Sequence, residues 1–424
     1  MVAALKGIED RREETDAHVR GRLPPMSRSR TALYGNLLLV FGSVLVTLVV
    51  AEVALRLLGV SYPYWSRVDP LTGFSPRPGI SGIVHDEGAA FVSINSAGFR
   101  DREHTVEKPS DTIRVAVLGD SYTEGKQVEM DETFWSVAER ELAACPARGK
   151  ARVEFLNFGV SGYGTAQEWL LLERIWPYQP DVVVVAFTAG NDVINNSREI
   201  EGGDNKPYVE DVDGVLTPDF SFRAKPFFQK QTSLTSWIAL AVIDHSRVAQ
   251  LVAQVLRVAR RKQAVQTAAT AETASGAVLR EFGLDRDIYT APKTAAYARA
   301  WRLTELLLQG IAAQARTHKS GIVVMTVPIS IQTHPDPAVR DAARRKLKVP
   351  NLFYAENRVI AAGKRGNYPV LALGRPMQRD AQAQKTFFNG APGMAPGSGH
   401  WNAKGHGEAG RLLSQFLCSK GIIH

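Results

Sequence analysis

Residues 113–118 read Ile-Arg-Val-Ala-Val-Leu, and residues 119–125 follow as Gly-Asp-Ser-Tyr-Thr-Glu-Gly. The apolar, β-branched run predicts a buried strand, and the glycines on both sides of Ser121 predict a tight turn directly after it. Such a turn presents the serine hydroxyl at the carboxyl edge of a parallel sheet, where open α/β sheets bind their ligands. Ser121 is therefore the first candidate for a nucleophile.

Apolar runs continue this pattern toward the C-terminus. Strands are expected at 113–118, 153–156, 181–187, 321–327 and 368–373, with helical patterns at about 134–142, 166–176, 293–318, 338–362 and 403–418. Parallel-type strands joined by helices form a sheet that is covered on both faces. We predict an α/β fold, a three-layer α/β/α sandwich with a doubly wound, mostly parallel five-stranded sheet of the flavodoxin-like type.

The composition is that of a globular protein, with 424 residues, 45% hydrophobic and 22% charged residues and a net charge of +8. Basic residues are scattered, and the sequence contains no zinc-ligand spacing, no P-loop and no basic stripe interleaved with aromatic residues. We therefore expect no nucleic-acid partner. The two cysteines, Cys145 and Cys418, form no CxxC motif, which argues against a thiol redox site, and the sequence leaves open whether they pair.

The segment from Thr31 to Ala51 contains no charged residue. A helix of roughly 20 residues is about 30 Å long, which is enough to cross the hydrocarbon core of a bilayer. Arginines precede it at positions 20, 22, 28 and 30, so the positive-inside rule places the N-terminus in the cytosol. The alternatives are a cleaved signal peptide, for which the small residues at the cleavage site are missing, and a buried core helix.

We therefore predict an uncleaved signal anchor over residues 31–58, which crosses the inner (plasma) membrane once. Residues 1–30 form its cytosolic tail, and the remainder lies on the periplasmic or extracytoplasmic side. Residues 59–110 are a Pro- and Gly-rich linker with short β-like stretches, and residues 111–424 form the main domain.

An insertion interrupts the main domain at about 193–290. Within it, the stretch from Trp237 to Lys262 carries apolar residues at helical spacing. Such a helix could cover the site, lie on the membrane beside the anchor, or simply pack on the domain. Ordinary packing is the preferred interpretation.

Three further sequence blocks lie at places that share one edge of a doubly wound sheet. Asn157-Phe-Gly-Val-Ser-Gly162 follows the second expected strand, and Gly190-Asn-Asp192 follows the third. His400-Trp-Asn-Ala-Lys-Gly405 stands just before the last expected helix. The fold thus predicts that these blocks converge with Ser121 on one crevice.

With the serine turn, these blocks read GDSxTxG, NxGxxG, GND and HWNxxG, and together they resemble the SGNH hydrolases, also called the GDSL lipase/esterase superfamily. The resemblance covers about residues 110–420, apart from the insertion. The segments Asn95–Asp101 and Ala51–Gly59 look like the membrane-anchored bacterial type. The resemblance implies a hydrolase of acyl or acetyl esters that needs neither a metal nor a cofactor.

The resemblance also implies a role for each block. Ser121 would attack the ester carbonyl, and His400 would take its proton and later protonate the leaving alcohol. The oxyanion hole would consist of the Ser121 N–H, the Gly162 N–H and the side-chain amide of Asn191.

One member of the family's catalytic set is absent from its usual place. The family places an acid two or three residues before the histidine, and this chain has Gly397 and Ser398 there. A backbone carbonyl or Ser398 could orient the histidine instead, or an acid such as Asp336 or Asp380 could come from elsewhere in the fold. The third alternative is weakened or lost activity. His406 is the weaker candidate for the base, because it lies inside the expected last helix.

The sequence thus predicts a membrane-anchored serine hydrolase that acts outside the cytosol, on an ester of an envelope glycan or lipid. One alternative is an O-acyltransferase that acts on an exported envelope polysaccharide and uses the same residues. The other is a catalytically weak scaffold of an envelope assembly, which the missing acid motivates.

Overall fold

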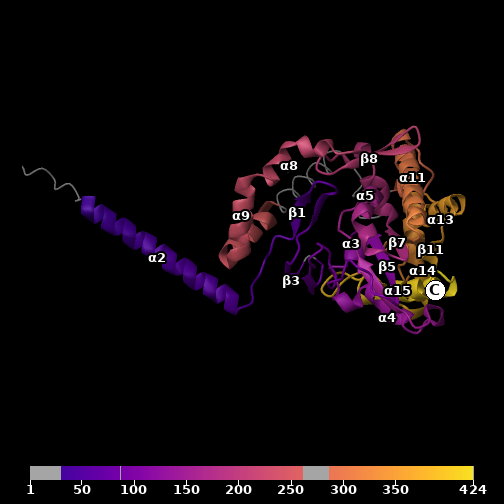
Figure 1. The fold of residues 1–424 in the computed structure, drawn as a ribbon, viewed down its shortest axis with the longest axis horizontal. Helices are drawn as coiled ribbons and strands as arrows, with labels where there is room; N and C mark the ends of the chain where they lie inside the picture. Colours follow the sequence, from indigo (N-terminus) through magenta and orange to yellow (C-terminus); the bar gives the residue numbers. More distant parts are fainter. Residues whose placement is uncertain (1–29, 86, 261–285, 424) are drawn as a thin grey trace, which may run out of the picture. The chain divides into compact units, whose positions relative to one another are not determined.

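The computed structural model describes residues 30–85, 87–260 and 286–423. The predicted cytosolic tail up to residue 29, with its arginines at 20, 22 and 28, lies outside the described residues, as does the end of the insertion from residue 261 to 285. The chain divides into two compact units, Met1–Val60 and Ser61–His424. The second unit contains the whole sheet and both of its helical layers (Figure 1).

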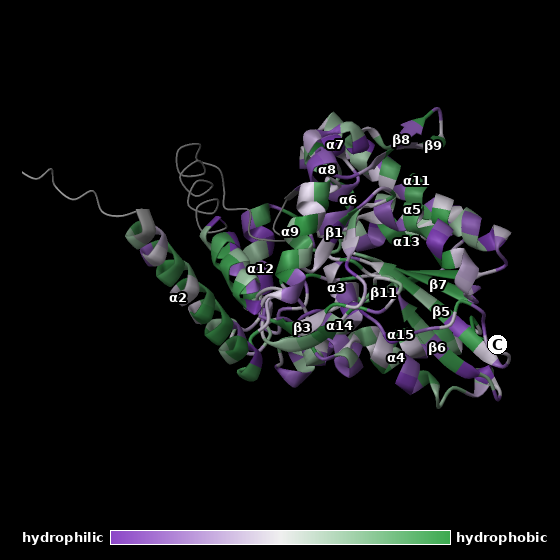
Figure 2. Cartoon of the chain, turned by 60° about the vertical axis from the view of Figure 1, so that its left-hand side comes forward, coloured by the Kyte–Doolittle hydropathy of each residue, from purple (hydrophilic) through white to green (hydrophobic). Residues whose placement is uncertain are grey.

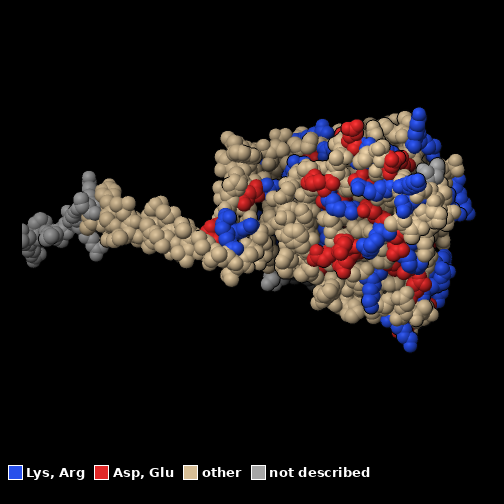
Figure 3. Space-filling model, turned by 60° about the horizontal axis from the view of Figure 1, so that its bottom comes forward, with Lys and Arg blue, Asp and Glu red and all other residues tan. Residues whose placement is uncertain are grey.

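The first unit contains the apolar helix α2 (Arg30–Leu57). Its large apolar side chains are exposed along its length, and Ala32–Leu57 is long and apolar enough to cross a membrane. Most of the helix is tan in Figure 3, because no residue from Thr31 to Ala51 is charged, and Glu52 and Arg56 in its C-terminal part form an ion pair of 2.7 Å. The predicted apolar helix near the N-terminus is therefore present.

The second unit is built on a five-stranded sheet in which every neighbouring pair is parallel. Its strands are β5 (Thr112–Gly119), β6 (Arg152–Asn157), β7 (Val182–Phe187), β10 (Gly321–Thr326) and β11 (Val370–Ala372). They lie in the order β11-β10-β7-β5-β6, which is 2-1-3-4-5 in sequence order. This is the flavodoxin-like order of a doubly wound sheet, so the predicted fold class is confirmed.

Helices cover both faces of the sheet because its side chains alternate between two apolar layers. Val115 and Val117 on β5 belong to one core, with α4 (Phe134–Leu142), α14 (Gly374–Gln384) and α15 (Ala403–Ser419). Ala116 and Leu118 belong to the other core, with α5 (Thr165–Ile175), α11 (Ala295–Thr317) and α13 (Tyr354–Gly366). The strands of the sheet are mostly green, the hydrophobic colour, in Figure 2.

The linker between α2 and the sheet belongs to the second unit and forms two antiparallel hairpins. These are β1 (Ser66–Asp69) with β2 (Gly73–Pro76), and β3 (Ser81–Val84) with β4 (Ala90–Ser93). After β7 comes α6 (Ala189–Asn195), and the insertion then adds a third hairpin and further helices: α7 (Arg198–Glu201), β8 (Tyr208–Val212), β9 (Val215–Asp219), α8 (Pro226–Gln231) and α9 (Leu234–His245).

Two stretches expected as single helices are each divided. The pattern from Trp237 onward forms α9 and a second helix, Arg247–Arg260, which meet at 114°. Ser246 is extended at the break, and its hydroxyl accepts a hydrogen bond from the Ala249 N–H, so it caps the second helix. The stretch 338–362 forms α12 (Pro337–Leu347) and α13, because Lys348 turns into the left-handed region two residues before Pro350.

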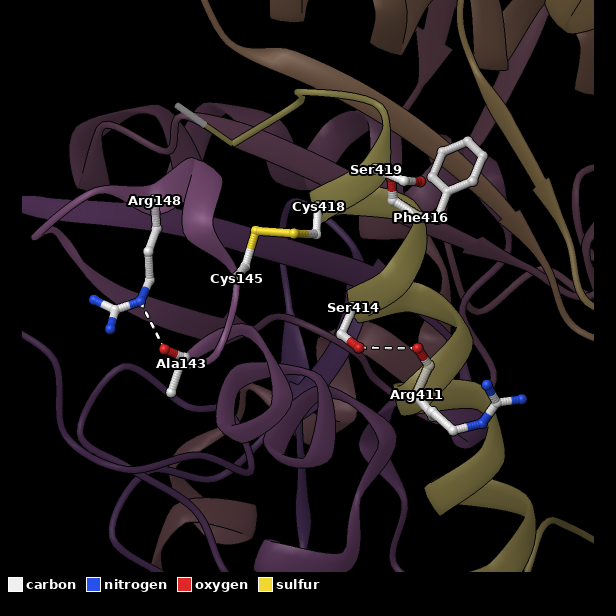
Figure 4. Close-up of a disulfide and its surroundings, with 8 residues drawn as sticks. All are labelled: Ala143, Cys145, Arg148, Arg411, Ser414, Phe416, Cys418 and Ser419. Carbon is white, nitrogen blue, oxygen red and sulfur yellow. Dashed lines mark hydrogen bonds between the residues drawn. A yellow bond between two sulfur atoms is a disulfide. The ribbon is translucent and has the colours of Figure 1, made fainter.

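A disulfide joins the two cysteines of the chain. Cys145 follows α4 and Cys418 lies in the last turn of α15, with their Cα atoms 5.9 Å apart (Figure 4). The bond ties together two helices that already pack in one hydrophobic core. The pairing left open by the sequence is thus present in the fold.

Candidate active site

Ser121 stands where the sequence places it, directly after β5. It is the first residue of the short helix α3 (Ser121–Glu124), which Asp120 caps by accepting a hydrogen bond of 2.9 Å from the Tyr122 N–H. At Gly119 an added Cβ would lie 2.1 Å from the Thr123 hydroxyl oxygen. Only glycine therefore allows the turn that lifts Ser121 from the sheet.

His400 reaches Ser121 across the carboxyl edge of the sheet. The Ser121 Oγ lies 2.7 Å from His400 Nε2. The ring of Tyr122 packs 4.8 Å from the imidazole ring. Asn402 caps α15 with hydrogen bonds from the Lys404 and Gly405 N–H groups, which fixes the loop that carries the histidine.

Glu87 contacts the other side of the same histidine. Its Oε2 atom lies 2.8 Å from His400 Nδ1 and accepts a hydrogen bond of 3.0 Å from the His400 backbone N–H. The hydrogen bond with His400 is the main cause that lowers the pKa of Glu87 below its usual value of 4.5, so Glu87 is ionised at neutral pH. An ionised carboxylate requires a proton on Nδ1, which leaves the Nε2 lone pair for the Ser121 hydroxyl.

Glu87 reaches this place from the loop between β3 and β4, in the segment expected to be a linker. Gly399 makes the approach possible, because an added Cβ there would lie 2.6 Å from Glu87 Oε2. At Gly88 an added Cβ would lie 2.9 Å from the Ala391 side chain, so the hairpin tip also packs on the histidine loop.

The other candidates for the acid or the base have different partners. Asp336 caps α12 through the Ala338 N–H, and Asp380 lies 3.5 Å from Arg411. Ser398 donates its hydroxyl to the Ala395 carbonyl. His406 is fully buried, and burial lowers its pKa to about 3, so it is neutral at physiological pH.

Asn191 and Gly162 follow the two strands that flank β5, as expected. Asn191 lies in α6, after β7, and its amide donates one N–H to Asp120 Oδ2 at 2.5 Å. A side-chain amide has two such N–H groups, so a second one is left for a ligand. Gly162 follows β6 with φ +86°, a conformation that favours glycine.

Glu124 ties the Gly162 turn to the serine turn. It is fully buried in α3, and its Oε2 accepts a hydrogen bond of 2.8 Å from the Ser161 N–H. Its Oε1 lies 2.8 Å from Lys126 Nζ. The residue next to Gly162 is thus anchored on the same short helix that begins with Ser121.

Residues 95–100 of the linker contact the backbone that follows the serine turn. Arg100 is fully buried and donates hydrogen bonds to the carbonyl of Glu124 at 3.0 Å and to that of Val128 at 2.5 Å. The Asn95 side chain accepts a hydrogen bond from the Phe99 N–H, which closes the turn between these two residues. Residues 95–100 therefore hold the backbone that follows Ser121.

Three acidic side chains are buried behind the site. Burial raises the pKa of Asp120, of Asp192 to about 8, and of Glu168 well above its usual value. Asp192 accepts hydrogen bonds from the Thr165 hydroxyl and the Thr188 N–H. Across the described part of the chain, no group of three or more His, Cys, Asp or Glu side chains is arranged to hold a metal ion.

The doubly wound sheet and the four sequence blocks at its carboxyl edge are those of the SGNH class. A sequence model of the GDSL-like lipase/acylhydrolase family matches residues 117–407, and this chain belongs to that family. Glu87 lies outside the matched residues, so the family pattern carries no signal for it. No functionally curated protein matches this chain.

Several solved structures are similar to this chain. They include an acetyl xylan esterase (12% identity, TM-score 0.35), which covers 73% of this chain and 99% of its own. An acetylxylan esterase from Geobacillus stearothermophilus (13%, TM-score 0.33) covers 73% and 94%. A GDSL-like lipase from Bacteroides thetaiotaomicron (13%, TM-score 0.33) covers 75% and 92%.

Proposed function

We propose that this protein is a serine esterase that cleaves acyl or acetyl esters with Ser121, His400 and Glu87. The observation that carries the proposal is the continuous chain of contacts from Glu87 Oε2 to His400 Nδ1 and from His400 Nε2 to Ser121 Oγ, both under 3 Å. A serine hydroxyl becomes a nucleophile only when a positioned base takes its proton, and this arrangement supplies that base.

In the first half of the reaction, Ser121 Oγ attacks the ester carbonyl while His400 Nε2 takes the hydroxyl proton. The imidazolium that forms is stabilised by the Glu87 carboxylate. His400 then gives the proton to the leaving alcohol as the ester C–O bond breaks, and the acyl group stays on Ser121. In the second half, water attacks the acyl group, and His400 passes a proton from the water back to Ser121.

The negative charge on the carbonyl oxygen needs hydrogen-bond donors at both tetrahedral intermediates. We assign this role to the Ser121 N–H, the Gly162 N–H and the second N–H of the Asn191 amide. Asp120 supports the assignment because it fixes the orientation of that amide. Glu124 supports it by holding the turn that contains Gly162.

The absence of an acid two or three residues before His400 was the reason to consider a non-catalytic scaffold. Glu87 removes this reason, since a carboxylate contacts the ring from another segment. An O-acyltransferase would use the same three residues and differ only in the group that attacks the acyl-enzyme.

We further propose that α2 is an uncleaved signal anchor and that the catalytic unit lies outside the cytosol. The helix has the length and apolarity of a membrane span, and Cys145 and Cys418 are paired, as is common in oxidising compartments. An ester of an envelope glycan or lipid is then the substrate class within reach. Carbonate extraction followed by N-terminal sequencing tests the anchor, and a soluble product that starts near residue 55 would contradict it.

The activity itself is tested with the purified full-length protein and p-nitrophenyl acetate. Ser121→Ala and His400→Ala should each abolish hydrolysis, and a fluorophosphonate probe should label the wild type but not Ser121→Ala. Ser398→Ala is the matched control, because Ser398 lies in the histidine loop and donates its hydroxyl to the Ala395 carbonyl of the same loop. Equal rates for wild type and Ser121→Ala would reject the esterase.

The transferase is separated from the esterase by adding a deacetylated glycan as acceptor. Loss of free acetate with the appearance of acetyl groups on the glycan would identify a transferase. Unchanged release of acetate identifies a hydrolase.

A further inference from the structure

The insertion carries an apolar surface, which we define as the exposed side chains of α9 and of the helix Arg247–Arg260. Four large apolar side chains of α9 are between 49% and 71% exposed, Leu240 and Ile243 are half-buried, and no residue of this helix is buried. On the second helix four apolar side chains are 42% to 59% exposed, while Val248 and Leu251 are half-buried. The residues concerned are Leu234, Trp237, Ile238 and Val242 on α9, and Val252, Val255, Leu256 and Val258 on the second helix.

Helical spacing places these side chains on continuous stripes. Leu234, Ile238 and Val242 are four residues apart on α9, and Val252 and Val255 are three apart on the second helix. In a soluble domain such stripes face a core, yet here they face outward. Each helix is far shorter than the roughly 20 residues that a membrane span requires.

Both helices form hydrogen bonds or ion pairs with the segment that follows α2. The Tyr62 N–H donates a hydrogen bond of 2.9 Å to the side chain of Gln250, which is 3% exposed. Arg247 also contacts the Ser61 hydroxyl. On the α9 side, Arg77 forms a bidentate ion pair with Asp244.

Chain connectivity then limits how far the apolar surface can be from a bilayer. Only residues 58–60 separate the end of α2 from Ser61, and an extended chain spans at most about 3.6 Å per residue. Arg247 at the start of the second helix is bonded to Ser61. That end of the helix therefore lies within about 14 Å of a bilayer that contains Leu57.

The side chains around this surface are those that proteins place at a lipid–water boundary. Residues 61–65 read Ser-Tyr-Pro-Tyr-Trp, and tyrosine and tryptophan are enriched at membrane interfaces. The helix Arg247–Arg260 contains three arginines, at 247, 257 and 260, and no acidic residue. Such a charge favours anionic phospholipid headgroups.

We propose that the apolar surface of the insertion docks on the same bilayer that α2 crosses, with its side chains at the level of the headgroups. The occupant of this surface is therefore lipid. The catalytic unit then contacts the membrane through this surface as well as through α2. The inference rests on the proposed anchoring by α2 and adds a second, interfacial contact.

The test uses the full-length chain in vesicles of phosphatidylethanolamine and phosphatidylglycerol. Both native cysteines are in the disulfide, so a cysteine introduced at one position gives the only free thiol for an environment-sensitive fluorophore. Val242→Cys probes the apolar surface. Val106→Cys is the matched control, since Val106 is 52% exposed and Val242 is 55% exposed.

We expect the label at residue 242 to be quenched several-fold more by spin-labelled lipid chains than by aqueous iodide, and the label at 106 to show the reverse. Equal access of iodide to both labels would overturn the docking. Protection from iodide without quenching by lipid would also overturn it, because a protein would then cover the surface. Failure of the chain to float with the vesicles would show instead that the anchoring by α2 is wrong, and the inference would fall with it.

Discussion

Glu87 Oε2 faces both the ring and the backbone of His400, at 2.8 Å from Nδ1 and 3.0 Å from the main-chain nitrogen, across 313 residues of sequence. Two hydrogen bonds to one carboxylate oxygen fix the ring orientation as well as its tautomer. The side chains are partly exposed, 17% for His400 and 23% for Glu87, so solvent reaches both of them. In the proposed mechanism, the hairpin β3–β4 therefore contributes to the chemistry of a domain that begins later in the sequence.

Replacing Glu87 should abolish most of the activity without unfolding the protein. Glu87→Gln keeps the size of the side chain but removes the charge that stabilises the imidazolium, so kcat/KM should fall by about 10²- to 10⁴-fold. Steady-state hydrolysis of p-nitrophenyl acetate measures this. Glu103→Gln, an exposed acid in the same segment that bonds Ser96, is the control and should keep full activity. A Glu87→Gln protein as active as the control would remove Glu87 from the mechanism.

The glycine before the histidine should also be needed for activity, because it leaves room for the Glu87 carboxylate. Gly399→Ala puts a methyl group 2.6 Å from Glu87 Oε2, so the carboxylate must move away and kcat should fall by about 10-fold or more. Gly393→Ala is a matched control, because Gly393 lies in the same loop at a positive φ, +89°, with no atom within 4 Å of the added Cβ. Both variants carry similar backbone strain, and equal losses of kcat would refute the role of Gly399.

The fold and most of the site follow from local sequence patterns. Apolar, β-rich runs predicted all five strands, since a parallel sheet covered on both faces needs apolar side chains at most positions of each strand. Arg114 and Glu154 are exceptions, and they pair with each other at 2.8 Å across β5 and β6. The order of the four blocks predicted that Ser121 and His400 would meet, because a doubly wound sheet brings its carboxyl ends to one edge.

Other features depend on long-range packing, which no local pattern reports. Nothing near Glu87 in the sequence marks it as part of the site, because its contact with His400 comes from a hairpin that packs on a loop 313 residues away. The helix α14 was missed because its buried face consists of only Gly374, Met377 and Ala381, too few apolar residues for a clear stripe. The pair α9 and Arg247–Arg260 was expected as one helix because Ser246 is compatible with a helix interior as well as with a cap.

Removal of the Asn191 amide should slow the chemical step while leaving substrate binding nearly unchanged. A donor that binds the oxyanion acts mainly in the transition state, so Asn191→Ala should lower kcat by about 10²- to 10³-fold with little change in KM. Asn195→Ala is the control on the same helix, since Asn195 bonds the exposed Glu201 instead. A rise in KM at constant kcat would mean that Asn191 binds the ground state.

The stability of the protein should depend on pH through Glu168. This side chain is 1% exposed, and within the described residues neither of its carboxyl oxygens has a hydrogen-bond partner. Burial, together with the charges of Asp192 and Asp120, raises the pKa of Glu168 well above its usual value of 4.5. Above pH 4.5 the unfolded chain loses a proton that the folded chain still holds, so the free energy of unfolding decreases as the pH rises, by at most about 1.4 kcal/mol per unit.

Glu168→Gln replaces the ionisable carboxyl with an amide that does not titrate, so its stabilising effect relative to the wild type should increase as the pH rises. We expect the difference in Tm between the variant and the wild type to grow from pH 5 to pH 8, as measured by thermal unfolding in a buffer series. Glu173→Gln, an exposed position on the same helix α5, should give a difference that is independent of pH. The comparison between variants cancels the titration of groups that do not interact with Glu168, so a flat difference for Glu168→Gln would show that Glu168 folds in its ionised form.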